Sequence, residues 1–345
     1  MARQLRPWRA DLAYKHEMMA ANPLSFLRGT FYRWAELWSE HCREEADAPV
    51  LLAVGDVHVE NYGTWRDVEG RLVWGLNDFD EATPLPYTQD LVRLVASARL
   101  AIQLGRLRIR FREASAAVLS GYRECLHAGG RPLVLAETDL WLRRIATSRL
   151  RDPVVFWKQM ADHPALTEPP RGEVNAVLLA ELPAGTTEVR WLRRRAGVGS
   201  LGRPRLAAMA QWQGGLIARE AKSLLPSAWG WRNPGLEPSH YNQVLDAAVR
   251  CPDPGLGVAG GWITRRLAPD CSRVELASLP VKRDEYRLLK AMGWELANIH
   301  LGSPLAIPLV IEDLGARPDG WLRRAGKTMA EATFADWKEW RASRS

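Results

Sequence analysis

Cysteine motifs, long apolar runs and internal repeats are what this sequence lacks. The four cysteines, Cys42, Cys125, Cys251 and Cys271, lie far apart and form no CxxC pair, which argues against a zinc knuckle or a disulfide framework. The longest apolar runs are much shorter than the roughly 20 residues that a membrane helix needs. The N-terminal stretch has no apolar core of the kind found in secretory signals. We therefore expect a cytoplasmic protein with no membrane partner.

The composition is that of a folded protein with a packed core, and the charge pattern does not suggest a nucleic-acid-binding protein. The chain has 345 residues, of which 47% are hydrophobic and 25% are charged, enough material for a packed core. The net charge is +7, but the basic residues are scattered, apart from the run Arg193–Arg195. Without a basic face or a recognised motif, a nucleic-acid partner is not expected. A basic protein does favour anionic ligands such as nucleotides.

Hydrophobic periodicity predicts an α+β fold with the strands in two separate stretches. Helices are predicted over 1–45 (broken at Asn22-Pro23), 88–104, 107–128, 136–162, 239–250 and from 283 onward. Strands are predicted over 48–54 and 71–76, and again between 188 and 222 with a hairpin turn at Gly214-Gly215, and near 258–277. The Pro- and Gly-containing region 165–186 marks a lobe boundary. The polar tail from residue 317 carries no clear pattern.

The segment GDVHVENYG, residues 55–63, follows the first predicted strand and has three interpretations. It is an ordinary polar turn, the opening motif of a metal-dependent phosphatase, or the catalytic loop of a kinase. Asp56 and His58 fit the Asp-x-His of binuclear phosphatases. The remaining histidines lie in no further metal-binding motif, whereas a two-metal site needs more ligands.

The kinase interpretation accounts for more of the surrounding sequence. Asp56 and Asn61 have the catalytic-loop spacing of Asp, four residues, Asn. Asp78 follows the second predicted strand and precedes an aromatic residue, as a metal-binding aspartate should. Asp56 would orient the acceptor hydroxyl as the base, and Asn61 and Asp78 would hold Mg²⁺. His58 would mainly support the loop, and Asp80 would either hold a second metal ion or cap the next segment.

A possible phosphate-binding element lies in the second β-rich stretch. GVGSLG provides Gly197, Gly199, Ser200 and Gly202 in a GxGxxG pattern after a strand-like run. Glycines let the backbone approach phosphate oxygens closely. A proline and another strand follow, so the dinucleotide-binding interpretation fails its context. Lys222, twenty residues after Gly202, would pair with the phosphates.

Together these motifs resemble a known family. GDVHVENYG, LNDFDE, DLVRLVASA, GVGSLG and the K-x-x-x-P-S beginning at Lys222 look like the bacterial domain-of-unknown-function 2252 family (DUF2252). SFLRGTF near the N-terminus and AMGWELANIHLG near the C-terminus also fit it. That family is similar to the protein-kinase-like superfamily, and its GDxHxxN resembles that of aminoglycoside phosphotransferases. The resemblance implies a two-lobed kinase-like fold with its site at these motifs. An Asp at the position of Asp90 is then an N-cap and loop anchor.

The order of the motifs differs from that of ordinary kinases, because the aspartates precede the glycine-rich segment and the lysine. We therefore expect a circularly permuted arrangement. Residues 1–165 would form the helical catalytic lobe, 166–280 the β-rich nucleotide lobe, and 281–345 a return to the helical lobe plus the polar tail.

The expected function is an ATP- and Mg²⁺-dependent phosphotransferase acting on a hydroxyl of an unidentified small molecule or protein. An ordinary kinase pairs its lysine with a helix glutamate, but the helix at 239–250 has no glutamate and offers Gln243 and Asp246 to Lys222 instead. This departure keeps two alternatives open, a nucleotidyl (AMP) transferase and a catalytically silent nucleotide-binding pseudokinase. A metal-dependent phosphatase is the third. Arg28 would either reach the site or pair with an acid, and Gly29 suggests a special backbone conformation.

Overall fold

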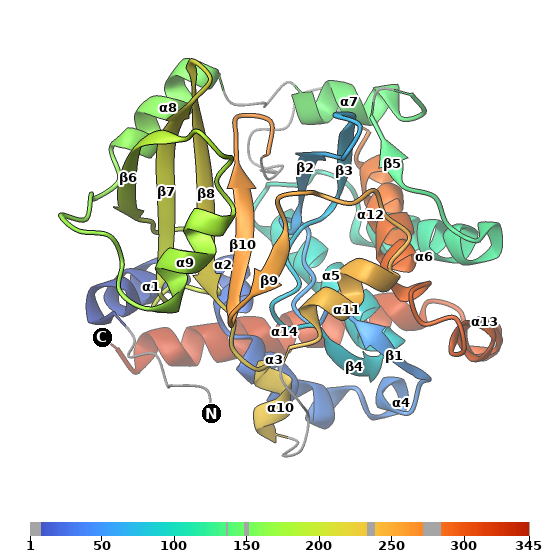
Figure 1. Cartoon of the computed structure of the whole chain (residues 1–345). Helices are drawn as coiled ribbons and strands as arrows, with labels where there is room; N and C mark the ends of the chain where they lie inside the picture. Colours follow the sequence, from blue (N-terminus) through green and yellow to red (C-terminus); the bar gives the residue numbers. More distant parts are fainter. Residues whose placement is uncertain (1–7, 136, 148–151, 233–238, 272–283, 345) are drawn as a thin grey trace.

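A five-stranded antiparallel sheet lies beside a larger group of helices and small sheets (Figure 1). The computed structural model describes residues 8–344, except 136, 148–151, 233–238 and 272–283. The fold is α+β, as the sequence predicts, and all its strand pairs are antiparallel. Among the described helices, none has the length and apolarity to cross a bilayer. The four cysteines are not joined to one another.

The N-terminal region is helical, and its break falls at Asn22-Pro23 as predicted. The helices are α1 (Arg9–Ala21), α2 (Pro23–Gly29), α3 (Phe31–His41) and α4 (Arg43–Ala46). The Asn22 side chain accepts a hydrogen bond from the Ser25 amide at 2.8 Å, and Pro23 occupies the first helical position. A side-chain cap followed by proline at this position starts a new helix.

Two small sheets follow, and the two strands predicted in this region fall in different ones. The predicted strands are present as β1 (Val50–Ala53) and β3 (Leu72–Leu76), but they do not pair with each other. β1 pairs with β4 (Thr83–Pro86), whereas β3 lies between β2 (Tyr62–Arg66) and β5 (Leu133–Val134). The sequence analysis missed β2 because it continues directly from the polar GDVHVENYG segment.

The five-stranded sheet has the order β6-β7-β8-β10-β9. Its strands are β6 (Thr187–Arg193), β7 (Arg205–Trp212), β8 (Gly215–Ser223), β9 (Gly257–Ala259) and β10 (Trp262–Leu267). The β7–β8 hairpin turns at Gln213 and Gly214, whose φ angles are 45° and 82°. Trp212 and Gly215 are the pair that closes the turn, one residue from the predicted position. Two consecutive positive φ angles match the twist of a two-residue hairpin.

A helix covers each face of this sheet. Val174, Val177 and Leu178 of α9 (Glu173–Ala180) pack on one face, and Phe156 and Met160 of α8 (Pro153–Ala161) pack on the other. Figure 1 shows α9 in front of the strands and α8 along their upper part. Helix α9 falls in the stretch that its Pro and Gly content had marked as a boundary, so a covering helix was not expected there.

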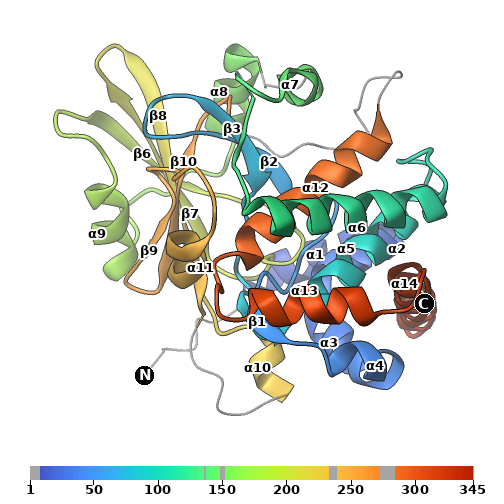
Figure 2. The ribbon, with the colours of Figure 1, turned by 90° about the vertical axis from the view of Figure 1, so that its right-hand side faces the viewer.

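The remaining helices build the largest hydrophobic core (Figure 2). They are α5 (Tyr87–Gln103), α6 (Phe111–Ala128), α7 (Leu140–Thr147), α10 (Ala228–Arg232), α11 (Tyr241–Ala247), α12 (Glu285–His300), α13 (Ile307–Ala316) and α14 (Trp321–Ala342). Helices α6 and α12 approach closely, since a Cβ at Gly121 would lie 1.9 Å from the Lys290 carbonyl oxygen. The polar tail proves to be the long helix α14, which packs on α5 and α3.

Candidate functional site

The turn after β1 is held in place from the side of the helical core. A Cβ at Gly55, whose φ is 78°, would lie 2.4 Å from the backbone oxygen of Glu81, so only glycine fits. The Asp90 carboxylate accepts hydrogen bonds from the amides of Val54 (2.7 Å) and Gly55 (2.9 Å) and also contacts His300 Nε2 at 3.0 Å. Asp90 is therefore a loop anchor, but it is not an N-cap, because α5 begins three residues earlier and Pro86 occupies the cap position.

Asp56 projects from this turn and is bound by a buried arginine. The guanidinium of Arg93 donates to Asp56 Oδ1, with Nε at 3.0 Å, and also to the Leu27 carbonyl at 2.9 Å. Arg93 is fully buried and stacks on the rings of Phe31 and Trp34, at 4.9 and 4.8 Å from their centroids. The Asp56 side chain keeps 23% of its surface exposed. It is thus rigidly oriented yet accessible.

The electrostatic surroundings raise the pKa of Asp56 to about 6. Burial is the largest cause, since it disfavours the charged carboxylate. Arg93 opposes it, whereas the nearby carboxylates of Glu81 and Asp78 raise the pKa further. A carboxylate with a pKa near 6 is still ionised at neutral pH and is a better proton acceptor than an ordinary aspartate.

Asn61 and His58 line the same turn. Asn61 Nδ2 donates to the backbone oxygens of Asp56 (3.4 Å) and Asp78 (3.3 Å), which fixes the direction of its amide. Its Oδ1 is buried and accepts no hydrogen bond within the described part of the chain. His58 Nδ1 accepts from the Glu60 amide at 3.2 Å, a contact that supports the turn. A buried acceptor without a partner is the group that a metal ion would satisfy.

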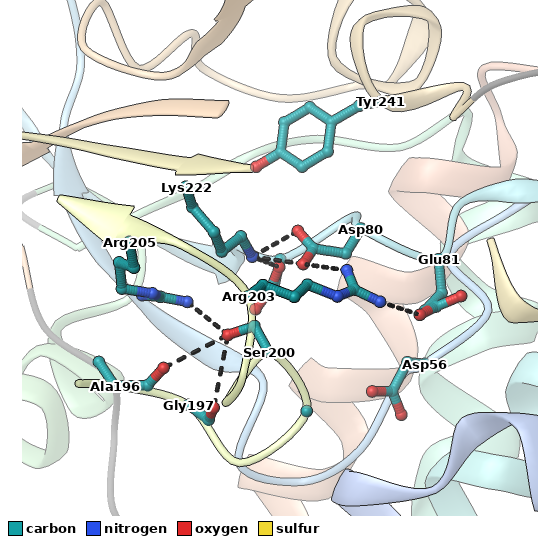
Figure 3. A network of polar contacts seen from close by, with 12 residues as sticks. Asp56, Asp80, Glu81, Ala196, Gly197, Ser200, Arg203, Arg205, Lys222 and Tyr241 are labelled. Carbon is teal, nitrogen blue, oxygen red and sulfur yellow. Dashed lines mark hydrogen bonds and ion pairs between the residues drawn. The ribbon is translucent and has the colours of Figure 1, made fainter. Parts of the chain in front are cut away.

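The two aspartates after β3 face the buried lysine of β8. Lys222, 1% exposed, places Nζ 3.2 Å from Asp78 Oδ1 and also binds both oxygens of Asp80 (Figure 3). Arg265 of β10 lies 3.3 Å from Asp78 as well. Burial raises the pKa of Asp80, as does the neighbouring Asp78, and burial lowers the pKa of Lys222. The acidic partners of Lys222 are therefore Asp78 and Asp80; Gln243 of α11 binds His240 instead.

The glycine-rich loop, defined here as residues 194–204, joins β6 to β7 and folds over Asp56. Gly197 and Gly202 have φ angles of 72° and 95°. The amides of Ser200, Leu201 and Arg203 donate to carbonyls within the loop. A Cβ at Gly199 would lie 3.0 Å from the Arg28 carbonyl oxygen and 3.7 Å from Asp56 Oδ2. The loop thus comes close to Asp56 at a position without a side chain.

Ser200 and its neighbours fix the shape of this loop from the sheet side. Ser200 Oγ accepts a hydrogen bond from Arg205 Nη2 at 2.6 Å and lies 3.3 Å from the Ala196 carbonyl (Figure 3). Lys15 of α1 donates to the Gly199 carbonyl at 3.1 Å. The Arg205 and Lys15 side chains lie outside the loop, so the sheet and the N-terminal helix together set its conformation.

These segments enclose one cavity of ≈340 Å³, called the first cavity below. Every residue that the sequence proposed for the site lines it, apart from Lys222, which lies behind Asp78 and Asp80. The shared lining residues are Asp56, His58, Asn61, Asp78, Asp80, Gly197, Gly199, Ser200 and Gly202. Its volume is within the usual range for small-molecule sites. Segments more than a hundred residues apart thus meet at one place.

Several further lining or supporting residues were not foreseen. Lys15 lines the first cavity, and burial together with nearby Arg203 lowers its pKa to about 8. Arg203 lies 3.7 Å from Asp80 and 3.5 Å from Glu81. Arg203 directly follows the last glycine of the GxGxxG pattern, so its place in the sequence could have identified it as a site residue. Arg93 stood out as a charge within an apolar helix, whereas Lys15 had no distinguishing context.

Arg28 and Gly29, which the sequence left open, are both explained. Arg28 forms an ion pair with Glu60 and also lines the first cavity. Gly29 has no positive φ. A Cβ there would lie 2.7 Å from Met19 Sδ, so close packing rather than a special backbone conformation requires the glycine.

The groups that could hold Mg²⁺ are an amide oxygen and carboxylates. Among the described residues, no set of three or more His, Cys, Asp or Glu side chains is placed to share a metal ion. Asn61 Oδ1 and the carboxylate of Asp78 do face the first cavity. Mg²⁺ commonly uses one or two protein carboxylates and takes its other ligands from phosphate and water. This donor set fits Mg²⁺, and Asp80 is a third candidate.

Comparison with known proteins gives one match. Residues 8–153 match the model of a family described as an uncharacterized protein conserved in bacteria (DUF2252). No curated protein and no solved structure matches the chain. The matched segment contains Asp56, Asn61, Asp78 and Asp80, but it ends before the glycine-rich loop and Lys222. The match supports the resemblance to DUF2252 over this segment, which is less than half of the chain.

Proposed function

We propose that this protein is an ATP- and Mg²⁺-dependent phosphotransferase with a kinase-like, circularly permuted fold, acting on a hydroxyl acceptor. The observation that carries the proposal is the convergence of Asp56, Asn61 and Asp78 with the glycine-rich loop on the first cavity. Phosphoryl transfer needs positioning and charge stabilisation more than covalent chemistry from the protein. A base, two magnesium ligands, a glycine-rich loop and cationic side chains near the phosphates are the parts that it uses.

The arrangement of the sheet adds support. In protein kinases a glycine-rich loop covers the phosphates and the lysine lies on the third strand. Here the loop joins β6 to β7, the first two strands of the sheet, and Lys222 lies on β8, the third. Because Arg205 and Lys222 are directly paired across the two strands, the loop and the lysine face the same region.

Each group then has a defined task. Asp56 accepts the proton of the acceptor hydroxyl, and Arg93 holds it in position. Asn61 and Asp78 would hold Mg²⁺, which supplies charge neutralisation at the phosphates when bound. Lys15 and Arg203 line the first cavity and provide cationic groups for phosphate oxygens. His58 supports the turn that carries Asp56 and Asn61.

The pairing of Lys222 favours a second candidate function. Its partners are Asp78 and Asp80 of the proposed metal loop, rather than a helix glutamate. In an active protein kinase the lysine pairs with a helix glutamate. Nucleotidyl (AMP) transfer, or nucleotide binding without transfer, would use the same site with a different phosphate placement.

The test is a thermal-shift titration with Mg·ATP on the wild type, on Asp78→Asn and on Asp246→Asn as control. Asp246 is an exposed aspartate of α11 away from the first cavity. Ligand at 100 times its Kd stabilises a fold by about 2.7 kcal/mol. We expect a magnesium-dependent rise in Tm for the wild type and the control, and none for Asp78→Asn. No rise in the wild type with any nucleotide would refute the proposal.

Intact-mass measurement after incubation with Mg·ATP and candidate acceptors separates the two functions. Phosphoryl transfer adds one phosphate to the acceptor and releases ADP. Nucleotidyl transfer adds AMP and releases pyrophosphate. An AMP adduct would replace the first proposal by the second.

A further inference from the structure

A second cavity, of ≈490 Å³, lies on the other side of Gly197 and Arg28, which line both cavities. Its walls come from β7, β8 and β10, from the residues around β2, and from the segment after α11. The character of the two cavities differs. Among the described residues, four carboxylates and three cationic side chains line the first, whereas three acidic residues and seven arginines line the second.

Two of the three acidic residues of the second cavity form ion pairs, and the third, Asp253, accepts a hydrogen bond from the Gly255 amide at 2.9 Å. Glu60 pairs with Arg28 and with Arg106, the latter at 2.8 Å. Glu220 pairs with Arg194 and with Arg205, the latter at 3.0 Å. Burial acts to raise the pKa of Glu220, but the guanidinium groups outweigh it and hold that pKa well below its usual range. The arginines that pair with Glu60 and Glu220 are thus already engaged with carboxylates.

Two arginines of this cavity have no direct ion pair of this kind among the described residues, although Asp253 lies near enough to act electrostatically on both and Glu295 on Arg250. Within the described part of the chain, neither Arg250 nor Arg266 forms an ion pair with a carboxylate. Arg250 Nη1 donates to the Leu76 carbonyl at 3.2 Å, while its Nη2 is buried and without a partner. Arg266 Nη2 donates to the Arg66 carbonyl at 2.9 Å, while its Nε is likewise buried and unpartnered.

Buried guanidinium N–H groups without an acceptor destabilise the fold unless an anion binds to them. A buried charge requires a partner or a ligand, because burial removes its hydration. Burial lowers the pKa of Arg250, although a guanidinium remains protonated at any physiological pH. Its Cζ lies 4.6 Å from the Trp65 ring and 5.1 Å from the Phe79 ring, so aromatic stacking fixes its plane. The free N–H groups are thus pre-oriented donors.

We propose that the second cavity binds a polyphosphate group, meaning two or more adjacent phosphoryl groups of one ligand. The planar guanidinium matches phosphate oxygens and donates to them in pairs. Among the described lining residues, the seven arginines outnumber the three acidic residues by four, and one of these arginines, Arg265, also pairs with Asp78 of the first cavity. The cavity therefore keeps an excess of positive charge, which suits a group that carries several negative charges. The cavity volume also exceeds the space that one phosphate needs. The proposal is independent of phosphoryl transfer at the first cavity.

The polyphosphate has two possible sources. It belongs either to the nucleotide itself, extending past Gly197 from the first cavity, or to a separate phosphorylated metabolite. Both sources present the same chemistry to Arg250 and Arg266. A competition experiment with ATP separates them.

Isothermal titration calorimetry with sodium tripolyphosphate, without magnesium, tests the site. The variants are Arg250→Gln and Arg266→Gln, with Arg171→Gln as the control for loss of one positive charge, because the Arg171 side chain is 94% exposed. We expect saturable binding to the wild type, at least tenfold weaker binding to the first two variants, and a change of less than twofold in the control. Circular dichroism checks that each variant folds. If Arg250→Gln does not fold, the affinity of Arg266→Gln alone tests the proposal.

Absence of saturable binding, or equal affinity in all four proteins, would overturn the proposal. Given binding that depends on the two arginines, titration in the presence of ATP identifies the source. Competition assigns the site to the nucleotide's phosphates, and simultaneous binding assigns it to a second ligand. This assay omits magnesium and measures how arginines of the second cavity affect tripolyphosphate affinity. A negative result would therefore refute the polyphosphate site without bearing on the nucleotide site that the Asp78→Asn experiment tests.

Discussion

Replacing Asp56 by asparagine should stabilise the protein at pH 8. The pKa of Asp56 is about 6 in the folded protein against 3.8 for a free aspartate. The folded state therefore holds the proton more tightly than the unfolded state. Each pKa unit corresponds to about 1.4 kcal/mol, so ionised Asp56 destabilises the fold by at most about 3 kcal/mol. The 23% exposure of the side chain reduces this, and we expect about 1–2 kcal/mol.

The direction of the Asp56 pKa shift determines how the stability difference between variant and wild type varies with pH. Because the folded pKa is raised, wild-type stability from this group falls as the pH rises from about 4 to about 6. Asparagine cannot ionise, yet its oxygen can still accept from Arg93. The variant should therefore equal the wild type near pH 4 and exceed it above pH 7. Urea unfolding at pH 4, 5, 6, 7 and 8 measures the difference in unfolding free energy.

Asp67 is the matched control, because its pKa is shifted in the opposite direction to that of Asp56. Burial acts to raise its pKa, but hydrogen bonds from Arg71 and from the Glu69 amide outweigh it and lower the pKa. Asp67→Asn should therefore destabilise the protein at pH 8, with the loss shrinking as the pH falls through the folded pKa. An Asp56→Asn variant that is less stable than the wild type at pH 8, or a difference that does not vary with pH, would refute the electrostatic argument.

Three further predictions concern packing and the loop anchors. Gly121→Ala should destabilise the protein by about 1–3 kcal/mol or more, because the new methyl group would clash with the Lys290 carbonyl. The control Gly315→Ala lies at an exposed helical position with open space, so it should be neutral or stabilising by up to about 1 kcal/mol. Thermal unfolding of the two variants measures the difference. Lys222→Met leaves two adjacent carboxylates with Arg265 (at Asp78) and Arg203 (at Asp80) as their remaining cations, and should lower the unfolding free energy by up to about 3–5 kcal/mol at pH 8. The loss should be smaller at pH 5, where one carboxylate takes up a proton, and a loss independent of pH would contradict this account. Asp90→Asn leaves one of two buried amides without its acceptor and should cost about 1–3 kcal/mol in urea unfolding; an unchanged midpoint would show that the turn does not need the carboxylate.

If Asp56 also acts as the base, Asp56→Asn combines higher stability with lower activity. Removal of a positioned base usually lowers the rate by about 10²- to 10⁴-fold. Measurement of ATP turnover and unfolding on the same preparation checks both. Wild-type-like turnover by this variant would exclude the role of Asp56 as base while leaving the electrostatic argument intact.

The parts of the site that are close in sequence could be predicted. The spacing of Asp56 and Asn61, and the Asp-Phe-Asp that begins at Asp78, are local patterns that end strands. The glycine-rich loop was also recognisable, because strand-like runs lie on both sides of it, and these runs became β6 and β7. In these places local preference and tertiary structure agree.

The partners that arise only from folding could not be predicted. Arg93 reaches Asp56 across 37 residues, and Lys222 reaches Asp80 across 142. No periodicity encodes which charges meet at such separations. Lys222 in particular was compared with residues of its own β-rich stretch, whereas its partners lie in the other half of the fold. Strand β2 was missed because a polar functional segment leads into it without alternation.

The packing of the glycine-rich loop has a consequence for protein synthesis. Val198 of that loop lies in one apolar cluster with Met19 and Phe26 near the beginning of the chain and with Trp337 near its end. The Trp337 indole also donates to the Met19 carbonyl at 3.0 Å. On the ribosome, the sheet and the turn that carries Asp56 emerge well before Trp337. The loop gains this packing surface only once Trp337 has left the ribosome, so the nascent chain carries an unfinished first cavity until that point.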